Sequence, residues 1–195
     1  MVEQLHQWFV STDFKIWFYL NCQWRSEFLD TIMPFIRNQF FWAPLYLFLL
    51  IFLVYNYGWK GLIWCAGFVL CFALGDLISA SVIKPLVHRS RPCNDPRLKD
   101  FVQLIVPRSS GYSFPSSHAA NHFALGTYMA LTFHRRLKKI WPIPIFWALA
   151  VGYAQVYVGV HFPFDVVCGA LLGVLVGFLV AKVYHLYFTL AVHKP

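Results

Sequence analysis

Residues 40–57 read FFWAPLYLFLLIFLVYNY, a run of eighteen residues without one charged side chain. A helix needs about 20 mostly apolar residues to cross the hydrocarbon core of a bilayer. Aromatic residues stand at both ends of this run, where they would meet the two membrane interfaces. The run therefore predicts a membrane-spanning helix.

Four more segments have the length and apolar character of a span, which gives candidates at 40–57, 61–84, 115–133, 141–160 and 165–189. The last of them carries small residues at four-residue spacing, a stripe that lets a neighbouring helix approach closely: Gly169, Gly173 and Gly177. We therefore expect an all-α integral membrane protein, a bundle of about five transmembrane helices.

The first 39 residues differ from these spans because short apolar groups alternate with charges such as Asp13 and Lys15. This pattern is typical of one or two amphipathic helices that lie in the membrane interface. A sixth span at residues 5–21 would bury both of those charges. We expect a single domain over residues 1–195, with interfacial helices in 1–39 and the bundle in 40–190.

Composition and charge limit the kinds of partner. Of the 195 residues, 59% are hydrophobic and only 12% are charged, about half the share in a soluble domain. The net charge of +8 lies between long apolar runs, so anionic lipid headgroups are a better match than nucleic acid. We expect no nucleic-acid partner, and the composition does not fix the oligomeric state.

Two polar connections join the spans, a long one at residues 85–114 and a short one, HRRLKKI, at 134–140. Short loops rich in lysine and arginine tend to stay in the cytoplasm. The short connection has four such residues, which we interpret as a topology anchor: Arg135, Arg136, Lys138 and Lys139. The long connection would then lie on the outer face, together with the turn at 161–164.

Three polar clusters fall on that same face. The first is KPLVHRSRP at residues 84–92, in which Pro85 disfavours continued helix at Lys84. Taken alone, it is a snorkelling lysine followed by a basic loop. The second is FPSSH at 114–118, where Pro115 suits the first helical position and Ser113 a cap. Free amides at such a helix start can bind an anion.

The third cluster is GVHFPFD at residues 159–165, in which Pro163 marks another helix start. Asp165 is close enough in sequence to accept a proton from one nitrogen of His161, which leaves the other nitrogen free as base or nucleophile. Together the clusters provide two histidines and several cations at one membrane face. Such groups can stabilise a phosphoryl group in transfer without a metal.

The spacing Lys84-x6-Arg91-Pro92, then Pro115-Ser116-Ser117-His118, then His161-x3-Asp165 resembles the type-2 phosphatidic-acid phosphatase family. Its superfamily includes bacterial acid phosphatases and vanadium haloperoxidases. The resemblance implies that His161 is the nucleophile that forms a phosphohistidine and that Asp165 orients it. It implies that His118 protonates the leaving oxygen and later activates water. Lys84, Arg91, Ser116 and the Ser117 amide would bind the phosphate.

One position departs from the family, whose third motif usually begins Ser-Arg where this chain has Ala154-Gln155. Gln155 can still donate a hydrogen bond to the phosphate but brings no charge. Arg89 or Arg108 in the long connection could supply that charge instead. We expect an active enzyme, since both histidines, Lys84, Arg91 and Asp165 remain.

Three alternatives compete with this interpretation. His118 and His122, four residues apart on a helix, could bind a metal together with His161 and Asp165. A non-catalytic binder of lipid phosphates would retain the anion-binding residues, and Gln155 favours it. A small-solute channel fits the short chain and its clustered motifs less well. We expect neither metal nor other cofactor. Asp76, inside the second predicted span, is interpreted as a satisfied structural acid.

The expected function is hydrolysis of a phosphate monoester or diphosphate on a membrane lipid, because the motifs lie at the interface. Undecaprenyl diphosphate ranks first, before phosphatidylglycerophosphate, phosphatidic acid and the phosphates of lipid A. Nothing in the motif residues selects among these tails. The short loops resemble bacterial members, which places the protein in an inner membrane with its site on the periplasmic face.

Overall fold

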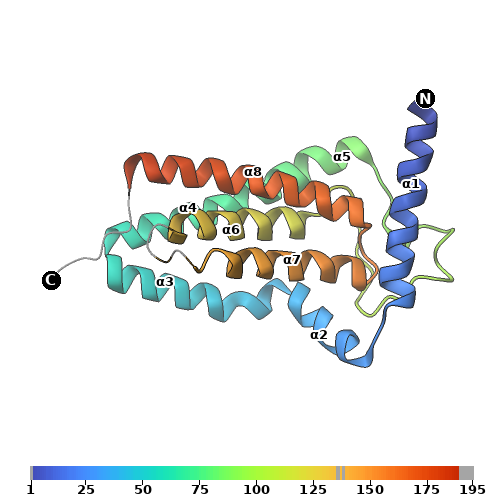
Figure 1. The fold of residues 1–195 in the computed structure, drawn as a ribbon, viewed down its shortest axis with the longest axis horizontal. Coiled ribbons are helices and arrows are strands. Elements are labelled where there is room, and N and C mark those ends of the chain that lie inside the picture. Colours follow the sequence, from blue (N-terminus) through green and yellow to red (C-terminus); the bar gives the residue numbers. More distant parts are fainter. Residues whose placement is uncertain (1, 135–136, 138, 189–195) are drawn as a thin grey trace.

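The structure is a computed structural model that describes residues 2–134, 137 and 139–188, and this part of the chain is helical without strands (Figure 1). The α-helices are α1 (Val2–Phe18), α2 (Glu27–Arg37), α3 (Ala43–Tyr57), α4 (Trp59–Asp76), α5 (Lys84–Val87), α6 (Ser117–His134), α7 (Pro142–Tyr157) and α8 (Pro163–Tyr187). Two π-helical turns, η1 (Tyr19–Gln23) and η3 (Leu77–Ile83), and two 3₁₀ turns, η2 (Gln39–Trp42) and η4 (Pro92–Asn94), connect them. The prediction of an all-α fold is confirmed.

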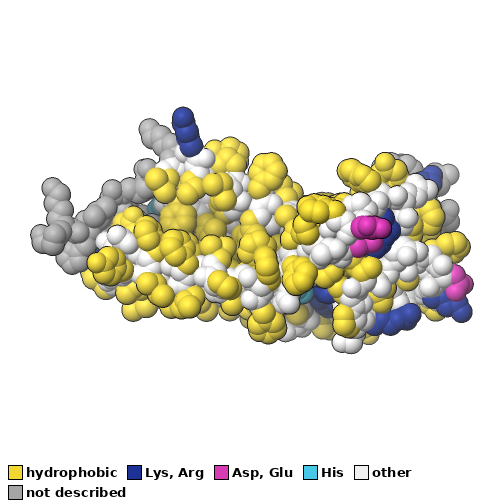
Figure 2. Space-filling view, turned by 90° about the horizontal axis from the view of Figure 1, so that it is seen from below, with side chains coloured by type: hydrophobic (Ala, Val, Ile, Leu, Met, Phe, Trp, Pro, Cys, Tyr) yellow, Lys and Arg dark blue, Asp and Glu magenta, His cyan; other side chains and the backbone are white. Residues whose placement is uncertain are grey.

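Each predicted span corresponds to a helix of the bundle. Three continuous helices are long and apolar enough to cross a membrane: Gln39–Tyr57, Trp59–Val87 and Pro163–Tyr187. The other two, α6 and α7, run beside them in Figure 1. Figure 2 shows hydrophobic side chains over the length of the bundle, whereas most of the visible charges gather at the end near α1 and α2. This distribution suits a protein whose sides face lipid.

Helix α6 is the centre of the bundle, and nearly all of its residues are buried against α4, α7 and α8. The glycine stripe of α8 faces it. A Cβ atom added at Gly169, Gly173 or Gly177 would lie 2.3–2.4 Å from a carbonyl oxygen at the start or in the body of α6. The stripe therefore allows the close helix approach that the spacing predicts. This contact also brings the first turns of α6 and α8 together, where the main-chain N–H of Ser116 donates to the carbonyl of Asp165.

Helix α1 lies crosswise over one end of the bundle instead of alongside the spans (Figure 1). Its residues Asp13 and Trp17 are buried, and Asp13 accepts a hydrogen bond of 2.8 Å from the main-chain N–H of Phe164 at the start of α8. Val10, Phe14 and Ile16 are exposed. The placement matches an interfacial helix and gives no support to a sixth span.

Two helix boundaries differ from the sequence-based prediction. The second span does not end at Lys84 but continues to Val87, because the wide π turn before Pro85 removes the usual clash with the preceding turn. Helix α6 begins at Ser117 rather than at Pro115. Its cap is the Ser116 hydroxyl, which accepts from the Ala119 N–H at 3.4 Å, whereas Ser113 bonds to Asp165. Of the four predicted cytoplasmic anchors, Arg135, Arg136 and Lys138 lie outside the described residues, and Lys139 is exposed.

Candidate active site

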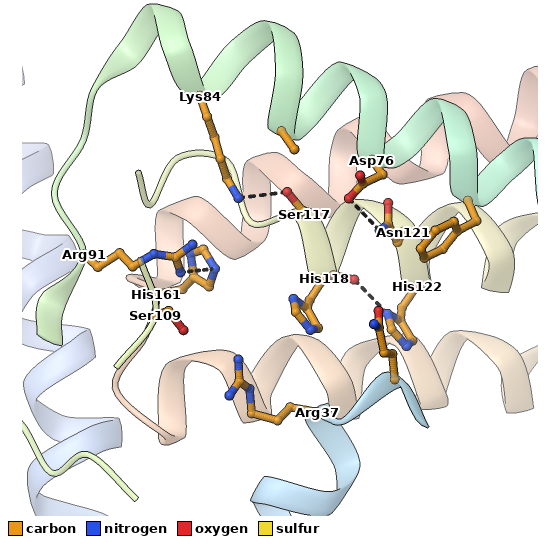
Figure 3. A pocket seen from close by; sticks show the side chains of 13 residues that line it. Arg37, Asp76, Lys84, Arg91, Ser109, Ser117, His118, Asn121, His122 and His161 are labelled. Atoms are coloured by element: carbon orange, nitrogen blue, oxygen red, sulfur yellow. Dashed lines mark hydrogen bonds between the residues drawn. The ribbon is translucent and has the colours of Figure 1, made fainter. Parts of the chain in front are cut away.

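A cavity of about 230 Å³ opens where α2, the end of the α4–α5 helix, the start of α6 and the turn before α8 meet (Figure 3). Its lining includes members of all three sequence clusters: Lys84 and Arg91, Ser117 and His118, and His161. The clusters, up to 77 residues apart in the chain, thus share one compartment as the sequence predicts. Both histidines face it.

His161 is the most constrained of these residues, with only 2% of its surface exposed. Its Nδ1 lies 3.5 Å from the Asp165 carboxylate and 3.4 Å from the Ser113 hydroxyl. Its Nε2 lies 3.0 Å from the Arg91 guanidinium. Because a guanidinium can only donate, this contact identifies Nε2 as the unprotonated nitrogen and Nδ1 as the one that carries hydrogen. The nitrogen with the lone pair therefore lies on the side of the cations.

Burial also determines the charge of this imidazole. Desolvation lowers the pKa of His161 to about 4, although the Asp165 carboxylate acts in the opposite direction. The ring is thus neutral at pH 7, which a nitrogen nucleophile requires. A neutral ring with an oriented Nδ1–H and an unprotonated Nε2 can attack an electrophile in the cavity once the Arg91 guanidinium donates to the ligand instead.

Asp165 is held from several directions at the first turn of α8. Ser113 donates its hydroxyl to the carboxylate, and the main-chain N–H of Phe162 donates at 2.9 Å. Arg89 adds an ion pair of 2.6 Å. These contacts fix the carboxylate beside His161, so the histidine ring cannot rotate without losing its partner.

Lys84, near the end of the second span, and Arg91, in the long connection, both bring positive charge to the cavity. Arg91 donates to main-chain carbonyls of Ser110, Gly111 and Val160, which holds its guanidinium against His161. Lys84 donates to the Ser117 hydroxyl at 2.9 Å (Figure 3). Hydrogen bonds to protein groups therefore orient both cations in the absence of a ligand.

His118 stands one residue further along α6 than Ser117. Its carbonyl lies 2.9 Å from His122 Nδ1, and the two rings are parallel with centroids 6.4 Å apart. Among the described residues, no three His, Cys, Asp or Glu side chains come together as a possible metal site. The set that the metal-dependent alternative needs is therefore not assembled.

Four sequence-predicted phosphate ligands are absent from the cavity lining. Ser116 caps α6, and the Arg108 side chain is exposed on the long connection. Gln155 is fully buried, and neither polar atom of its side chain has a hydrogen-bond partner within the described residues. Arg89 is bound to Asp165 and, at 2.5 Å, to Asp13. Arg89 is thus paired with two carboxylates and Arg108 lies outside the lining, so neither side chain faces the cavity in this arrangement.

Other residues line the cavity that the sequence analysis did not assign to it: Arg37, Gln39, Asp76, Ser109, Asn121 and His122. Arg37 is the last residue of α2. Its place in the site could not be predicted from the sequence, because a single arginine is common in an amphipathic segment. Asp76, interpreted from the sequence as a satisfied structural acid, accepts one long hydrogen bond of 3.4 Å from Asn121 Nδ2 and makes no ion pair within the described residues. It also lines the cavity. An acid within a span that faces a cavity is a functional candidate.

Comparison with known proteins now identifies the family. The PAP2 superfamily model matches residues 62–188, which include every motif described above. The chain belongs to the PAP2 superfamily. A lipid A 4'-phosphatase of Bacteroides thetaiotaomicron is 33% identical over 163 residues, 82% of this chain and 72% of that protein. An undecaprenyl-diphosphatase of Sulfolobus acidocaldarius is 32% identical over 158 residues, 80% of this chain and 70% of that protein.

Solved structures of the superfamily share the fold. Aquifex aeolicus LpxE matches with a TM-score of 0.67 and 30% identity over 85% of this chain and 92% of its own. A transmembrane PAP2-type phosphatidylglycerolphosphate phosphatase from Bacillus subtilis matches with a TM-score of 0.70 and 27% identity, over 91% and 87%. With three apolar helices of spanning length, this PAP2 chain is an integral membrane protein, and the predicted fold class is confirmed.

Proposed function

We propose that this PAP2 chain is a lipid phosphatase that hydrolyses a phosphate ester or diphosphate of a membrane lipid through a phosphohistidine, without a metal. The observation that carries the proposal is the convergence of two histidines, Lys84 and Arg91 on one cavity. Phosphoryl transfer needs mainly positioning and charge stabilisation, and these residues supply both. The family, whose relatives are named as phosphatases, supports the same conclusion.

In the first step, His161 Nε2 attacks phosphorus while the bond from phosphorus to the leaving oxygen breaks. His118 gives that oxygen a proton, so the lipid leaves as a neutral alcohol or as a monophosphate. Asp165 keeps the Nδ1–H of His161 in place and balances the positive charge that the ring acquires. Lys84 and Arg91 hold the equatorial oxygens as their charge develops.

In the second step, water attacks the phosphorus of the phosphohistidine and the P–N bond breaks. His118, now unprotonated, takes a proton from that water, which returns both imidazoles to their starting states. The products are inorganic phosphate and the dephosphorylated lipid. Each proton given in the first step is recovered in the second, so no further reactant is needed.

The size of the cavity favours a lipid headgroup as ligand. Pockets that enclose a drug-sized molecule have volumes of roughly 300–1,000 Å³. A cavity of about 230 Å³ accommodates a phosphorylated headgroup, while the tail stays in the bilayer. The candidates are undecaprenyl diphosphate, glycerolipid phosphates and the phosphates of lipid A, for which relatives are named. We place the site on the periplasmic face of a bacterial inner membrane.

The test uses purified protein in detergent with a chelator, supplied with each of these lipids, and phosphate release as the measurement. We expect turnover of at least one lipid, and its loss in His161→Ala and His118→Ala. His134→Ala, at the exposed far end of α6, is the matched control and should behave as wild type. The proposal is overturned if His161→Ala keeps most of the activity, or if vanadate binds and no lipid releases phosphate. The second result would support the non-catalytic binder.

A further inference from the structure

Arg37 enters the cavity from a part of the chain that carries none of the three motifs. It is the last residue of α2, 47 positions before Lys84, and in Figure 3 its guanidinium points toward the space between His118 and His161. No feature of the sequence pattern distinguishes it from the other basic residues of the first 39 positions. Its position beside both imidazoles is therefore information that only the fold supplies.

Arg37 lacks a protein partner for its charge. Within the described residues it makes no ion pair and no hydrogen bond, and its Nε is buried without an acceptor. Burial lowers the pKa of Arg37, and the nearby Arg91 guanidinium lowers that pKa further. A guanidinium nevertheless keeps its charge in proteins. A partly buried cation without a counter-ion is costly, and a ligand anion in the cavity would remove that cost.

Arg37 is one of three permanently basic side chains in the cavity lining. The others are Lys84 and Arg91, and Asp76 is the one carboxylate, which gives +2 before the proton that His118 carries as the acid is counted. A phosphate monoester carries about −1.5 to −2 at pH 7. Without Arg37 this sum falls to +1, so Arg37 contributes a large share of the positive charge that a bound phosphate would meet.

Helix α2 holds Arg37 in place through contacts that lie outside the cavity. The Tyr157 hydroxyl donates to Asp30 at 2.5 Å, which ties the middle of α2 to the end of α7. The Trp42 indole donates to the Ile36 carbonyl at 2.8 Å, one residue before Arg37. These contacts hold the end of α2 in place, and from there the Arg37 side chain extends into the cavity.

We propose that Arg37 binds the phosphoryl group and is the third basic residue of the site. In the family an arginine usually occupies the position of Gln155 on α7, but Gln155 is neutral and is not part of the cavity lining. This inference rests on the proposed phosphatase function and adds a substrate-binding residue from the N-terminal amphipathic region. It makes α2 part of the active site. The oxygens nearest His118 are the ones that the guanidinium can reach from its side of the cavity.

The experiment compares Arg37→Gln and Arg37→Lys with wild type in two measurements, kcat/KM for the best lipid phosphate and the Kd of orthovanadate by calorimetry. Loss of one donor to a developing oxyanion reduces rates by about 10²–10³. We expect Arg37→Gln to lose kcat/KM by that factor and to bind vanadate at least about tenfold more weakly. Arg37→Lys keeps the positive charge but not the planar guanidinium, so its kcat/KM and its vanadate affinity should lie between those of wild type and Arg37→Gln.

Lys99→Gln, which removes one exposed positive charge from the long connection, is the matched control and should change neither quantity by more than about threefold. Melting curves in detergent verify that each variant is folded. The inference is overturned if folded Arg37→Gln stays within threefold of wild type in both measurements. It is also overturned if Arg108→Gln lowers kcat/KM and vanadate affinity by the expected factors and Arg37→Gln does not.

The two proposals fail in distinguishable ways. If wild type releases no phosphate from any lipid but its vanadate affinity depends on Arg37, the phosphatase proposal fails and the Arg37 site stands. If wild type is an active phosphatase and Arg37→Gln is unchanged in both measurements, only the Arg37 inference fails.

Discussion

Arg89 joins the N-terminal helix to the carboxylate that orients the nucleophile, and replacing it tests this arrangement. One guanidinium nitrogen lies 2.6 Å from Asp165 and the other 2.5 Å from Asp13 on α1. The guanidinium also covers the Phe162 ring at 4.3 Å. The perturbation is Arg89→Gln, which retains a polar side chain and removes the charge. According to the structure, this change disturbs Asp165 and leaves the phosphate cavity intact.

The magnitude follows from the burial of the two carboxylates. Asp165 is fully buried and Asp13 is 7% exposed, while Arg89 is 25% exposed. Removing one partner of a buried ion pair costs about 3–5 kcal/mol, because the remaining charge is left uncompensated. We expect Arg89→Gln to lower the free energy of unfolding by that amount. The double variant Asp13→Asn/Arg89→Gln should be more stable than Arg89→Gln alone, since it removes one of the uncompensated carboxylates.

The assay is SDS titration of the protein in mixed micelles for stability, together with steady-state kinetics on the preferred lipid. We expect kcat to fall and KM to stay near the wild-type value, because Asp165 positions His161 and does not contact substrate. If Arg89→Gln instead raises KM and leaves stability and kcat unchanged, Arg89 binds the substrate phosphate. The ion pairs with Asp13 and Asp165 would then neither stabilise the fold nor orient the nucleophile.

Three further predictions concern packing, selectivity and pH. Gly173→Ala places a Cβ 2.3 Å from the Ala120 carbonyl oxygen and should lower the free energy of unfolding in the same SDS titration by about 1–3 kcal/mol. The control is Val174→Ala at an exposed, lipid-facing position, which should change that free energy little. Equal effects of the two substitutions would contradict the close α6–α8 contact. Asp76→Asn removes a negative charge from the cavity, so the ratio of kcat/KM for a lipid diphosphate to that for a monophosphate should rise about tenfold. An unchanged ratio would mean that the Asp76 carboxylate does not act on the charge of the bound substrate. Because His161 reacts as the neutral ring and its pKa is lowered to about 4, the acid limb of kcat/KM, corrected for substrate ionisation, should lie near pH 4. An acid limb at the ordinary histidine pKa of about 6.5 would be inconsistent with the buried ring.

The spans could be predicted from the sequence because lipid requires long apolar helices, and this requirement is local. Residues 40–57 contain the whole signal for α3, and the glycine stripe of α8 is visible without knowledge of its partner. The convergence of Lys84, His118 and His161 was also predictable, since the motifs stand at span ends on one face. These are properties that neighbouring residues in the chain determine.

What the sequence did not reveal depends on contacts between distant segments. Asp13 and Arg89 are 76 positions apart, so nothing in the sequence near Arg89 indicates that its guanidinium forms ion pairs with carboxylates. Pro115 favours a helix start locally, but Ser113 bonds to Asp165 and the helix begins two residues later. Arg37 reaches the cavity only because α2 folds back onto α7. The role of a basic side chain in this protein is decided by tertiary contacts that no motif contains.

The central claim, covalent transfer of phosphate to His161, is tested most directly by trapping the intermediate. His118→Ala is mixed with p-nitrophenyl phosphate, whose leaving group needs no protonation, in the presence of a chelator, and then quenched in alkali. Peptide mass spectrometry locates the phosphate. We predict one phosphoryl group on the imidazole of His161 and none in His161→Ala. Phosphate on another residue, or hydrolysis that requires an added metal ion, would contradict the account.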